Sequence, residues 1–202
     1  MRLSILICSV VKRKYMLEKL LDNLFRQSIK EFEFRPVQDG SMRVEIYYNE
    51  DFEIIVGIDN KEITVGKKRN KLISYAAGEY VTFIDDDDTV VNDYVPTLIY
   101  CSQFDFDALM FDVIYNPVNG TPKLVKYSAR MKDKELYTHY ERAANHLMMY
   151  KASIAKRVKF KNMTCGEDAE WAKRAVKHIH KEGRIDKVMY YYNFDHATTE
   201  TQ

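Results

Sequence analysis

Short apolar runs alternate with amphipathic stripes over the first 90 residues, and this alternation constrains the fold more than any other feature of the chain. The runs at Leu3–Cys8, Glu53–Asp59 and Tyr80–Ile84 have the length and composition of strands that are covered on both faces. Between them, apolar side chains recur every three or four residues at 17–24 and at 69–76, as in helices that pack one face on a sheet. The pattern predicts an α/β, Rossmann-like fold with a mostly parallel central sheet flanked by helices.

The rest of the chain is less regular. Residues 30–52 form a polar insertion in which Asp39-Gly40 predicts a turn and Val44–Tyr48 part of a small hairpin. Gly78 is expected to end the second helix in a left-handed conformation. In the second half we expect strands at 107–115, 121–127, 146–150 and 188–192 and a helix over 167–181. The length is typical of one domain, which we place at 1–202.

The composition excludes several classes of protein but does not identify a single class. The net charge of +1 indicates neither nucleic acid nor an anionic membrane as an obligatory partner. Cys8, Cys101 and Cys165 have no CxxC spacing, which argues against a structural zinc site and favours a reducing compartment. The first apolar run is too short for the core of a signal peptide, and no stretch approaches the roughly 20 apolar residues of a membrane span. We therefore expect a cytoplasmic protein without a membrane span.

Polar side chains follow the predicted strands at the edge where ligands bind in such sheets. Ser9 follows the first strand, Asp59 ends the second, and the third runs into the four aspartates at 85–88. Carboxylates this close raise one another's pKa, and a divalent cation with hard oxygen ligands would relieve that repulsion. Of Asp85 and Asp87, one would reach the metal while the other meets a sugar or ribose hydroxyl. The alternative is a solvated acidic loop.

Basic residues lie at the start of the helix that precedes the aspartates. Gly66-Lys67-Lys68-Arg69 places cations at a helix N-terminus, which suits phosphate oxygens. Arg69 shares a stripe with Leu72 and Ile73 and should point inward. The alternative is an arginine that lies along the core with its head in solvent.

A second acidic pair begins the helix predicted at 167–181. Thr164-Cys165-Gly166-Glu167 matches a capping box, with Thr164 as N-cap, which gives Glu167 a structural role. Asp168 lies on the face that carries Ala172, so it is expected to project inward, where a carboxylate can act as a general base. His146 begins an apolar run and is interpreted as a core residue, whereas His196 is a candidate metal ligand or phosphate contact.

Five segments together resemble family 2 glycosyltransferases of the GT-A fold. They are LSILICS, EIIVGID, VGKKRN, AAGEYVTFIDDDD and the distal GEDAEW, and they span most of the chain. The combination of GEYVTFIDDDD with a downstream GED is specific, and this version is most similar to small members from phages and mobile elements. The resemblance implies transfer of a sugar from a nucleotide-diphosphate sugar, usually UDP-linked, with Mn²⁺ or Mg²⁺ as cofactor.

The resemblance also implies a division of the domain and a role for each candidate residue. Residues 1–100 would bind the nucleotide sugar, and residues 101–202 would bind the acceptor. Asp168 would be the catalytic base that takes the acceptor proton in an inverting transfer. The donor would be bound by Ser9, Asp59, Lys68, Arg69, Asp85 and Asp86, and the metal by Asp85, Asp87 and His196.

Alternatives to this function remain open from the sequence. Where the family commonly has DDGS, this chain has Ile58-Asp59-Asn60-Lys61, so GDP-, CDP- and TDP-sugars are candidates beside UDP-sugars. A sugar nucleotidyltransferase on a similar sheet would need a glycine-rich phosphate loop after the first strand. An inactive binding module would keep the fold without turnover.

The acceptor has two candidate classes. A hydroxyl of a glycan or glycoconjugate is what the family resemblance most often implies. The second class is a hydroxylated base of modified phage DNA, whose phosphates would need a basic rim. The residues that could form this rim are Lys151, Lys156, Arg157, Lys159, Lys161, Lys173, Arg174, Lys177, Lys181 and Arg184.

Overall fold

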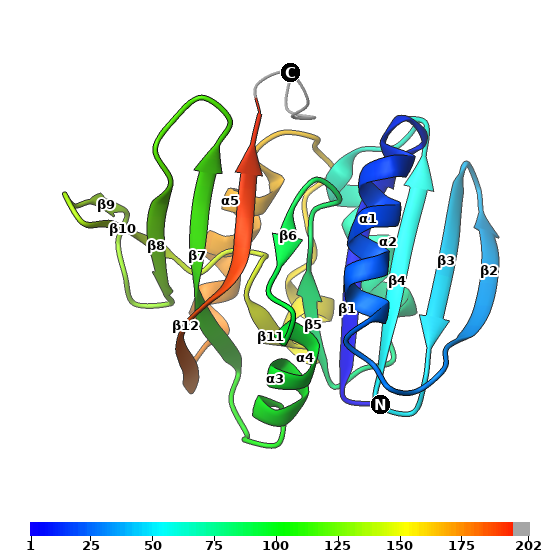
Figure 1. Cartoon of the computed structure of the whole chain (residues 1–202), viewed down its shortest axis with the longest axis horizontal. Helices are drawn as coiled ribbons and strands as arrows, with labels where there is room; N and C mark the ends of the chain where they lie inside the picture. The colour runs from blue at the N-terminus through cyan, green and yellow to red at the C-terminus, as the bar shows by residue number, and fades with distance from the viewer. Residues whose placement is uncertain (196–202) are drawn as a thin grey trace.

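Residues 1–195 are described by a computed structural model, and within them twelve strands form one mixed sheet with helices on both faces (Figure 1). The strands are β1 (Leu3–Val10), β2 (Glu33–Asp39), β3 (Met42–Tyr48), β4 (Phe52–Asp59), β5 (Tyr80–Phe83), β6 (Thr89–Val90), β7 (Ala108–Pro117), β8 (Lys123–Ser128), β9 (Lys134–Glu135), β10 (His139–Ala143), β11 (Met149–Lys151) and β12 (Glu182–Phe194). The helices are α1 (Lys14–Phe25), α2 (Val65–Tyr75), α3 (Tyr94–Cys101), α4 (Ala152–Val158) and α5 (Glu167–Ala175), with 3-10 turns η1 (Val11–Arg13) and η2 (Val176–His178). Neighbouring strands follow the order β2-β3-β4-β1-β5-β11-β7-β8-β10-β9, and β12 pairs with β7 and β6 beside this path.

The centre of the sheet has the predicted parallel arrangement. β1 pairs in parallel with β4 on one side and with β5 on the other. Every residue of β4 and β5 is buried, which explains their continuous apolar sequences. Antiparallel strands extend the sheet on both sides, because β3 pairs with β4 and β11 pairs with β5. The α/β, Rossmann-like class is therefore confirmed, with a sheet that is parallel at its centre and mixed overall.

Helices cover both faces of this parallel centre. α1 lies in front of β1 in Figure 1, whereas α2, α4 and α5 lie behind the sheet. α1 buries leucines 17, 20, 21 and 24, and α2 buries Leu72 and Ile73 together with two basic residues, Lys68 and Arg69. Both helices match the predicted stripes. Among the helices of residues 1–195, none has the length and apolarity to cross a membrane.

The insertion at residues 30–52 belongs to the main sheet. β2 and β3 form an antiparallel hairpin, and β3 continues onto β4. The turn contains Gly40 with φ of 65°, a left-handed conformation that glycine adopts without steric cost. The predicted hairpin is confirmed, and it lengthens one edge of the sheet.

The predicted elements of the second half differ in their bounds, and the strand expected at 188–192 is part of the longer β12. The helix expected at 167–181 ends at Ala175, and after η2 the chain enters β12, which pairs in parallel with β7 from Glu182 onward. The strand expected at 146–150 is shortened to β11, because a turn from Asn145 to Met148 precedes it. Residues 176–181, which the local pattern assigned to the helix, form η2 and the approach to β12 instead.

Gly78 does not end α2 in the way that the sequence predicts. α2 stops at Tyr75, and its C-cap Ala76 has extended backbone. The N–H of Gly78 donates to Ser4 Oγ at 2.8 Å, and a Cβ on Gly78 would come within 2.6 Å of the Ser4 backbone nitrogen. Glycine is therefore required for the close approach of two chain segments rather than for a left-handed cap.

Candidate active site

A cavity of about 200 Å³, which we call the aspartate cavity, opens beyond the carboxyl ends of β1 and β5. Its wall includes the turn after β1, the acidic loop after β5 and the N-terminal turn of α5. The titratable side chains of this wall include Arg13, Arg69, Asp85, Asp86, Asp87, His146, Glu167 and Asp168. The structure thus brings the FIDDDD and GED segments, which lie far apart in the sequence, to one site.

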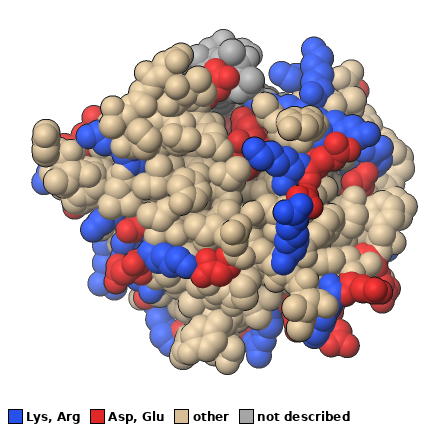
Figure 2. Space-filling view, in the orientation of Figure 1, with Lys and Arg blue, Asp and Glu red and all other residues tan. Residues whose placement is uncertain are grey.

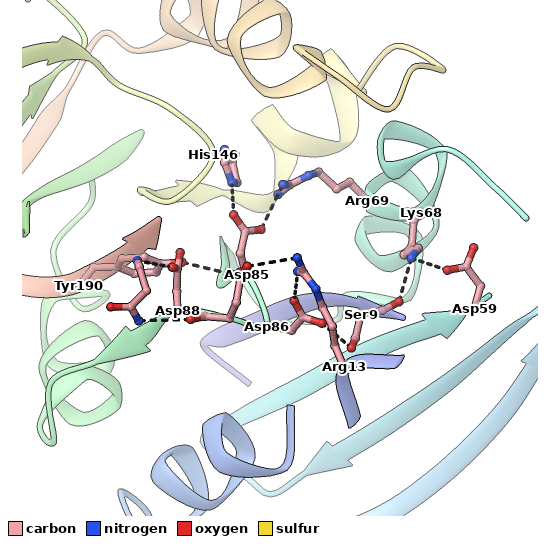
Figure 3. Close-up of polar contacts among 12 residues, drawn as sticks. Ser9, Arg13, Asp59, Lys68, Arg69, Asp85, Asp86, Asp88, His146 and Tyr190 are labelled. Atoms are coloured by element: carbon pink, nitrogen blue, oxygen red, sulfur yellow. Dashed lines mark hydrogen bonds and ion pairs between the residues drawn. The ribbon is translucent and has the colours of Figure 1, made fainter. Parts of the chain in front are cut away.

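Asp85 is paired with two basic side chains. Its Oδ1 lies 3.2 Å from Arg69 Nη2, and its Oδ2 lies 3.4 Å from His146 Nε2 (Figure 3). Burial alone would raise the pKa of Asp85, but the charges of Arg69 and His146 hold that pKa well below its ordinary value. Asp85 is therefore an ionised carboxylate in the cavity wall.

Arg13 pairs with the next two aspartates and was not among the predicted site residues. Its Nη1 lies 2.6 Å from Asp86 Oδ1, and its Nη2 lies 3.2 Å from Asp87 Oδ2. Ser9 Oγ donates to Asp86 Oδ2 at 2.6 Å. Burial raises the pKa of both carboxyls, that of Asp87 to about 6, although Arg13 opposes the shift. The signal that could have identified Arg13 is a basic residue in the turn after the first strand, at the sheet edge where the aspartates lie.

Asp88 has a structural role. Tyr190 Oη donates to its Oδ2 at 2.6 Å, and the backbone N–H of Asn193 donates to its Oδ1 at 2.7 Å. Burial raises the pKa of Asp88 well above its ordinary value. Tyr190 Oη also accepts the backbone N–H of Asp85 at 3.1 Å, and Asn193 Nδ2 donates to the Asp87 carbonyl at 3.2 Å. β12 therefore contacts the acidic loop at Asp85, Asp87 and Asp88.

Arg69 points inward, as predicted. Its guanidinium carbon lies 5.0 Å from the ring centroid of Phe83 and 5.6 Å from that of Phe160, and its Nε lies 3.4 Å from Glu167 Oε1. Arg69 is 4% exposed, and among the described residues its Nη1 has no hydrogen-bond partner. A buried cation with an uncommitted donor at a cavity wall suits an anionic ligand.

Ser9, Asp59 and Lys68 lie beneath the cavity rather than in its wall. Lys68 is 1% exposed, forms an ion pair with Asp59 and donates to the Ser9 carbonyl at 2.8 Å. This buried group joins α2 to β1 and β4 (Figure 3). Neither Lys68 nor Asp59 lines the aspartate cavity, because each satisfies the buried charge of the other. Their contact with a donor stays a prediction.

Glu167 has a role that the sequence misassigned. The N-cap of α5 is Gly166, with a left-handed φ of 74°, and no side chain caps this helix, so the predicted capping box with Thr164 is wrong. Glu167 is instead 5% exposed and pairs with Arg69. Burial raises the pKa of Glu167 against the attraction of Arg69. The local pattern could not reveal this role, because Arg69 belongs to α2.

Asp168 faces the cavity but is not buried. Its side chain is 40% exposed, and its Oδ2 lies 3.7 Å from His146 Nδ1. His146 is buried, as predicted, but its two ring nitrogens face two carboxylates, those of Asp85 and Asp168. A half-exposed carboxylate beside an imidazole can accept a proton from a bound hydroxyl.

The residues predicted to bind a divalent cation are partly assembled. His196 lies outside the described residues, and within residues 1–195 no three His, Cys, Asp or Glu side chains are grouped so as to hold a metal ion. Asp85 and Asp87 nevertheless line the same cavity with hard oxygen atoms. The raised pKa of Asp87 indicates a carboxylate whose charge is incompletely compensated. The donor set therefore fits Mg²⁺ or Mn²⁺ in its chemistry.

Comparison with known proteins identifies the family. The sequence profile of glycosyl transferase family 2 matches residues 4–165. The chain belongs to glycosyl transferase family 2. The resemblance carried by the motifs is therefore confirmed, and the protein contains a glycosyltransferase domain.

Three known proteins illustrate the similarity. Glycosyltransferase GlyA of Streptococcus pneumoniae is 34% identical over 86 residues, which are 41% of this chain and 12% of that protein. S. aureus TarS 1–349 in complex with UDP-GlcNAc has a TM-score of 0.67 at 17% identity, and the match covers 100% of this chain and 60% of that one. A putative glucose-1-phosphate thymidylyltransferase of Bacillus anthracis has a TM-score of 0.50 at 9% identity, with 93% and 87% covered.

The chain thus spans only part of the length of GlyA and of the TarS fragment. At these identities the two solved structures show a shared fold alone. The match to TarS confirms the GT-A-like arrangement of the sheet and helices. Because both transferases and nucleotidyltransferases share this fold, the family profile decides between the two enzyme classes.

Proposed function

We propose that this family 2 domain transfers a sugar from a nucleotide-diphosphate sugar to an acceptor hydroxyl, with inversion at the anomeric carbon. The observation that carries the proposal is a single cavity whose wall holds Arg69, Asp85, Asp87 and the half-exposed Asp168. UDP-sugars are the first choice of donor, because a protein of the same fold, TarS, binds UDP-GlcNAc. GDP-, CDP- and TDP-sugars are the alternatives.

Asp168 is the general base of the proposed reaction. Its carboxylate takes the proton of the acceptor hydroxyl while the hydroxyl oxygen bonds to the anomeric carbon. The bond from that carbon to the diphosphate breaks at the same time, on the opposite face of the sugar. His146 positions Asp168, because its Nδ1 lies 3.7 Å from Asp168 Oδ2 and its Nε2 is held near Asp85.

Arg69 stabilises the negative charge that grows on the leaving diphosphate. Its guanidinium is fixed by Asp85, Glu167 and two aromatic rings before any ligand binds, so little reorganisation is needed in the transition state. Asp85 and Asp87 would hold the divalent cation, with His196 as a further candidate. When bound, that cation would neutralise the diphosphate as a Lewis acid.

The distribution of charge favours a glycan acceptor over duplex DNA. Sequence-independent DNA binding requires basic side chains that are available to phosphates. Five of the ten candidate rim residues pair with acidic or carbonyl groups of the protein itself: Lys151 with Asp105, Lys156 with the Ala76 carbonyl, Lys161 and Arg174 with Glu170, and Arg184 with Asp112. Figure 2 shows the face opposite α4 and α5, and on it basic and acidic side chains lie next to one another.

Calorimetry with UDP-GlcNAc and its GDP, CDP and TDP counterparts, in Mn²⁺ and in EDTA, tests the donor part of the proposal. We expect binding in Mn²⁺ and much weaker binding in EDTA, because the carboxylates of the cavity otherwise repel the diphosphate. Equal affinity in both buffers would remove the metal from the proposal. Donor hydrolysis by the wild-type protein separates an enzyme from an inactive binding module.

The substitution Asp168→Asn tests the base. We expect turnover to fall by about 10²–10⁴-fold while the donor Kd stays nearly constant, because the amide has the same shape but cannot accept the proton. Glu170→Gln is the matched control, since Glu170 lies on the same helix outside the cavity wall. Loss of donor binding or of folding in Asp168→Asn would assign this residue a structural role.

A further inference from the structure

A second cavity, of about 700 Å³, opens beside the aspartate cavity. Tyr127, Asn145, Asp168 and Tyr192 line both cavities, so the two share a wall. The half-exposed carboxylate of Asp168 belongs to this shared wall. A ligand in the second cavity therefore has access to the group that we propose as the base.

Four tyrosine side chains line this second cavity, which we call the tyrosine groove. They are Tyr115, Tyr127, Tyr140 and Tyr192, from β7, β8, β10 and β12. The ring centroids of Tyr115 and Tyr192 lie 5.8 Å apart, so these two rings support each other. The first turns of α5 add the small apolar side chains of Ala169 and Ala172. The groove therefore presents flat apolar rings within reach of a carboxylate.

Tyr140 is held in a fixed position. The guanidinium carbon of Arg142 lies 4.9 Å from the ring centroid of Tyr140. Arg142 is itself anchored, because its Nη2 donates to Glu135 Oε1 at 2.9 Å and its Nη1 donates to the Lys134 carbonyl at 3.1 Å. A ring braced in this way loses little side-chain entropy when a flat ligand packs against it.

The charges in the groove favour a neutral ligand with many hydroxyls. Three lining residues are acidic, Asp133, Glu135 and Asp168, and two are basic, Arg142 and Lys173. Arg142 is already paired with Glu135, so the groove offers no surplus of positive charge to a phosphate. Carboxylates accept hydrogen bonds from hydroxyls, and the C–H face of a sugar ring is apolar enough to pack on tyrosine. A volume of about 700 Å³ is within the range of small-ligand sites, roughly 300–1,000 Å³.

We propose that the tyrosine groove binds a neutral saccharide portion of the acceptor, with Tyr140 as a packing surface, and presents one of its hydroxyls to Asp168. This assignment rests on the proposed function, because it requires that Asp168 receive the acceptor proton. It is specific in excluding an anionic polymer from the groove. Duplex DNA with hydroxymethylated bases is therefore a ligand that the groove should not bind.

Amide chemical-shift mapping of the ¹⁵N-labelled protein tests the assignment. The probes are maltotriose, cellotriose and chitotriose, each at tens of millimolar, and a duplex that carries hydroxymethylated cytosine. We expect at least one trisaccharide to shift amides of β8, β10 and α5, and the duplex to leave them unchanged. No binding by any of the three trisaccharides, or binding of the duplex in the groove, would overturn the proposal.

Substitutions of two tyrosines on one hairpin locate the site. Tyr140→Ala is expected to weaken trisaccharide binding about tenfold, because the packing surface is lost. Tyr140→Phe should bind nearly as well as the wild type, since it keeps the ring. Tyr137→Ala is the matched control, because Tyr137 is 96% exposed on the same hairpin and does not line the groove.

Donor affinity separates failure of this assignment from failure of the proposed function. Calorimetry with UDP-GlcNAc in Mn²⁺ should give the same Kd for the wild type, Tyr140→Ala and Tyr137→Ala, because Tyr140 does not line the aspartate cavity. Equal trisaccharide affinity in Tyr140→Ala and Tyr137→Ala, with donor binding intact, would overturn the groove assignment alone. Absence of nucleotide-sugar binding by the wild type would instead overturn the proposed function.

Discussion

Neighbouring carboxylates in the loop 85–88 differ in their affinity for protons because they face different partners. Asp85 lies between Arg69 and His146, which lower its pKa against the effect of burial. Asp87 has Arg13 on one side only, and burial together with the charges of Asp85 and Asp86 raises its pKa to about 6. Asp85 is therefore a stable anion, whereas Asp87 titrates close to neutral pH.

The raised pKa of Asp87 predicts how stability depends on pH in the metal-free protein. Because this pKa, about 6, exceeds the ordinary value of 3.8, the folded state binds the proton more tightly than the unfolded state. The free energy of unfolding should therefore fall as pH rises through 6, by at most about 3 kcal/mol. Carboxylates with lowered pKa values are ionised in both states above about pH 5 and add no slope there. Asp86, Asp88 and Glu167, whose pKa values burial also raises, add slopes of the same sign as Asp87.

Thermal melts between pH 5 and pH 7.5, in EDTA and in Mn²⁺, measure this effect. In EDTA the melting temperature should decline across this range, and Asp87→Asn should make the decline smaller. In Mn²⁺ the decline should shrink or reverse, because the ionised carboxylate then faces a cation. A flat profile in EDTA would mean that the aspartates are fully compensated by Arg13 and their other partners.

Lys68 and Asp59 form a buried pair whose disruption should affect stability rather than donor binding. Lys68→Met is expected to cost about 3–5 kcal/mol, because it leaves Asp59 charged and without its partner in the core. The double variant Lys68→Met/Asp59→Asn should recover part of that loss. Lys67→Met is the matched control, since Lys67 is exposed one position earlier on the same helix.

Chemical denaturation of these three variants gives the stabilities, and calorimetry with UDP-GlcNAc gives the donor Kd. The Kd should be the same in every variant that remains folded. A large loss of donor affinity in the folded double variant would show that Lys68 binds the donor, as its place at the start of a helix predicts.

The sequence alone predicted the acidic residues at the strand ends better than the basic residues that neutralise their charge. Asp85 and Asp87 could be located because a buried strand ends directly before them, and Arg69 because it shares an apolar stripe. Arg13 was not predicted, because its role depends on lying at the same sheet edge as the aspartates. Only the folded chain shows this. Lys68 was predicted to contact the ligand, because the N-terminus of a helix favours phosphates. In the structure its charge is paired with that of Asp59.

At the scale of elements, α5 shows how a local pattern can match the wrong motif. The sequence Thr164–Glu167 fits a capping box, but Gly166 is the N-cap and Glu167 turns to Arg69 on α2. This arrangement places Asp168 at the cavity wall. The strands β1, β4 and β5 and the helices α1 and α2 were predictable because their periodicity is local, whereas the start of α5 is determined by a distant partner.

The left-handed backbone at Gly166 predicts a defined cost for substitution. Gly166→Ala should destabilise the protein by about 1–2 kcal/mol, because an alanine at φ of 74° is strained even though nothing lies within 4 Å of its Cβ. Gly166→Asn should cost less, since asparagine tolerates this conformation. Denaturation curves of the two variants test this order. Equal stability would mean that α5 can begin with a different backbone conformation.

At the scale of the molecule, the site takes side chains from both halves of the chain. Arg13, Arg69 and the aspartates come from residues 1–100, and His146 and Asp168 come from residues 101–202. The assignment of donor binding to one half and acceptor binding to the other thus remains a prediction, with the aspartate cavity at their junction. The tyrosine groove lies entirely in the second half.

The whole-molecule charge predicts that duplex DNA binds weakly, if at all. The net charge is +1, and half of the candidate rim residues pair with acidic or carbonyl groups of the protein itself. Fluorescence anisotropy with a labelled duplex, with and without hydroxymethylated cytosine, at two salt concentrations measures this. We expect no measurable affinity at low salt for either duplex. An affinity that falls by about 0.9 power of salt concentration per phosphate contacted would show real phosphate neutralisation and make DNA the acceptor to pursue. A preference for the hydroxymethylated duplex would strengthen that conclusion, because the acceptor hydroxyl itself would then contribute to binding.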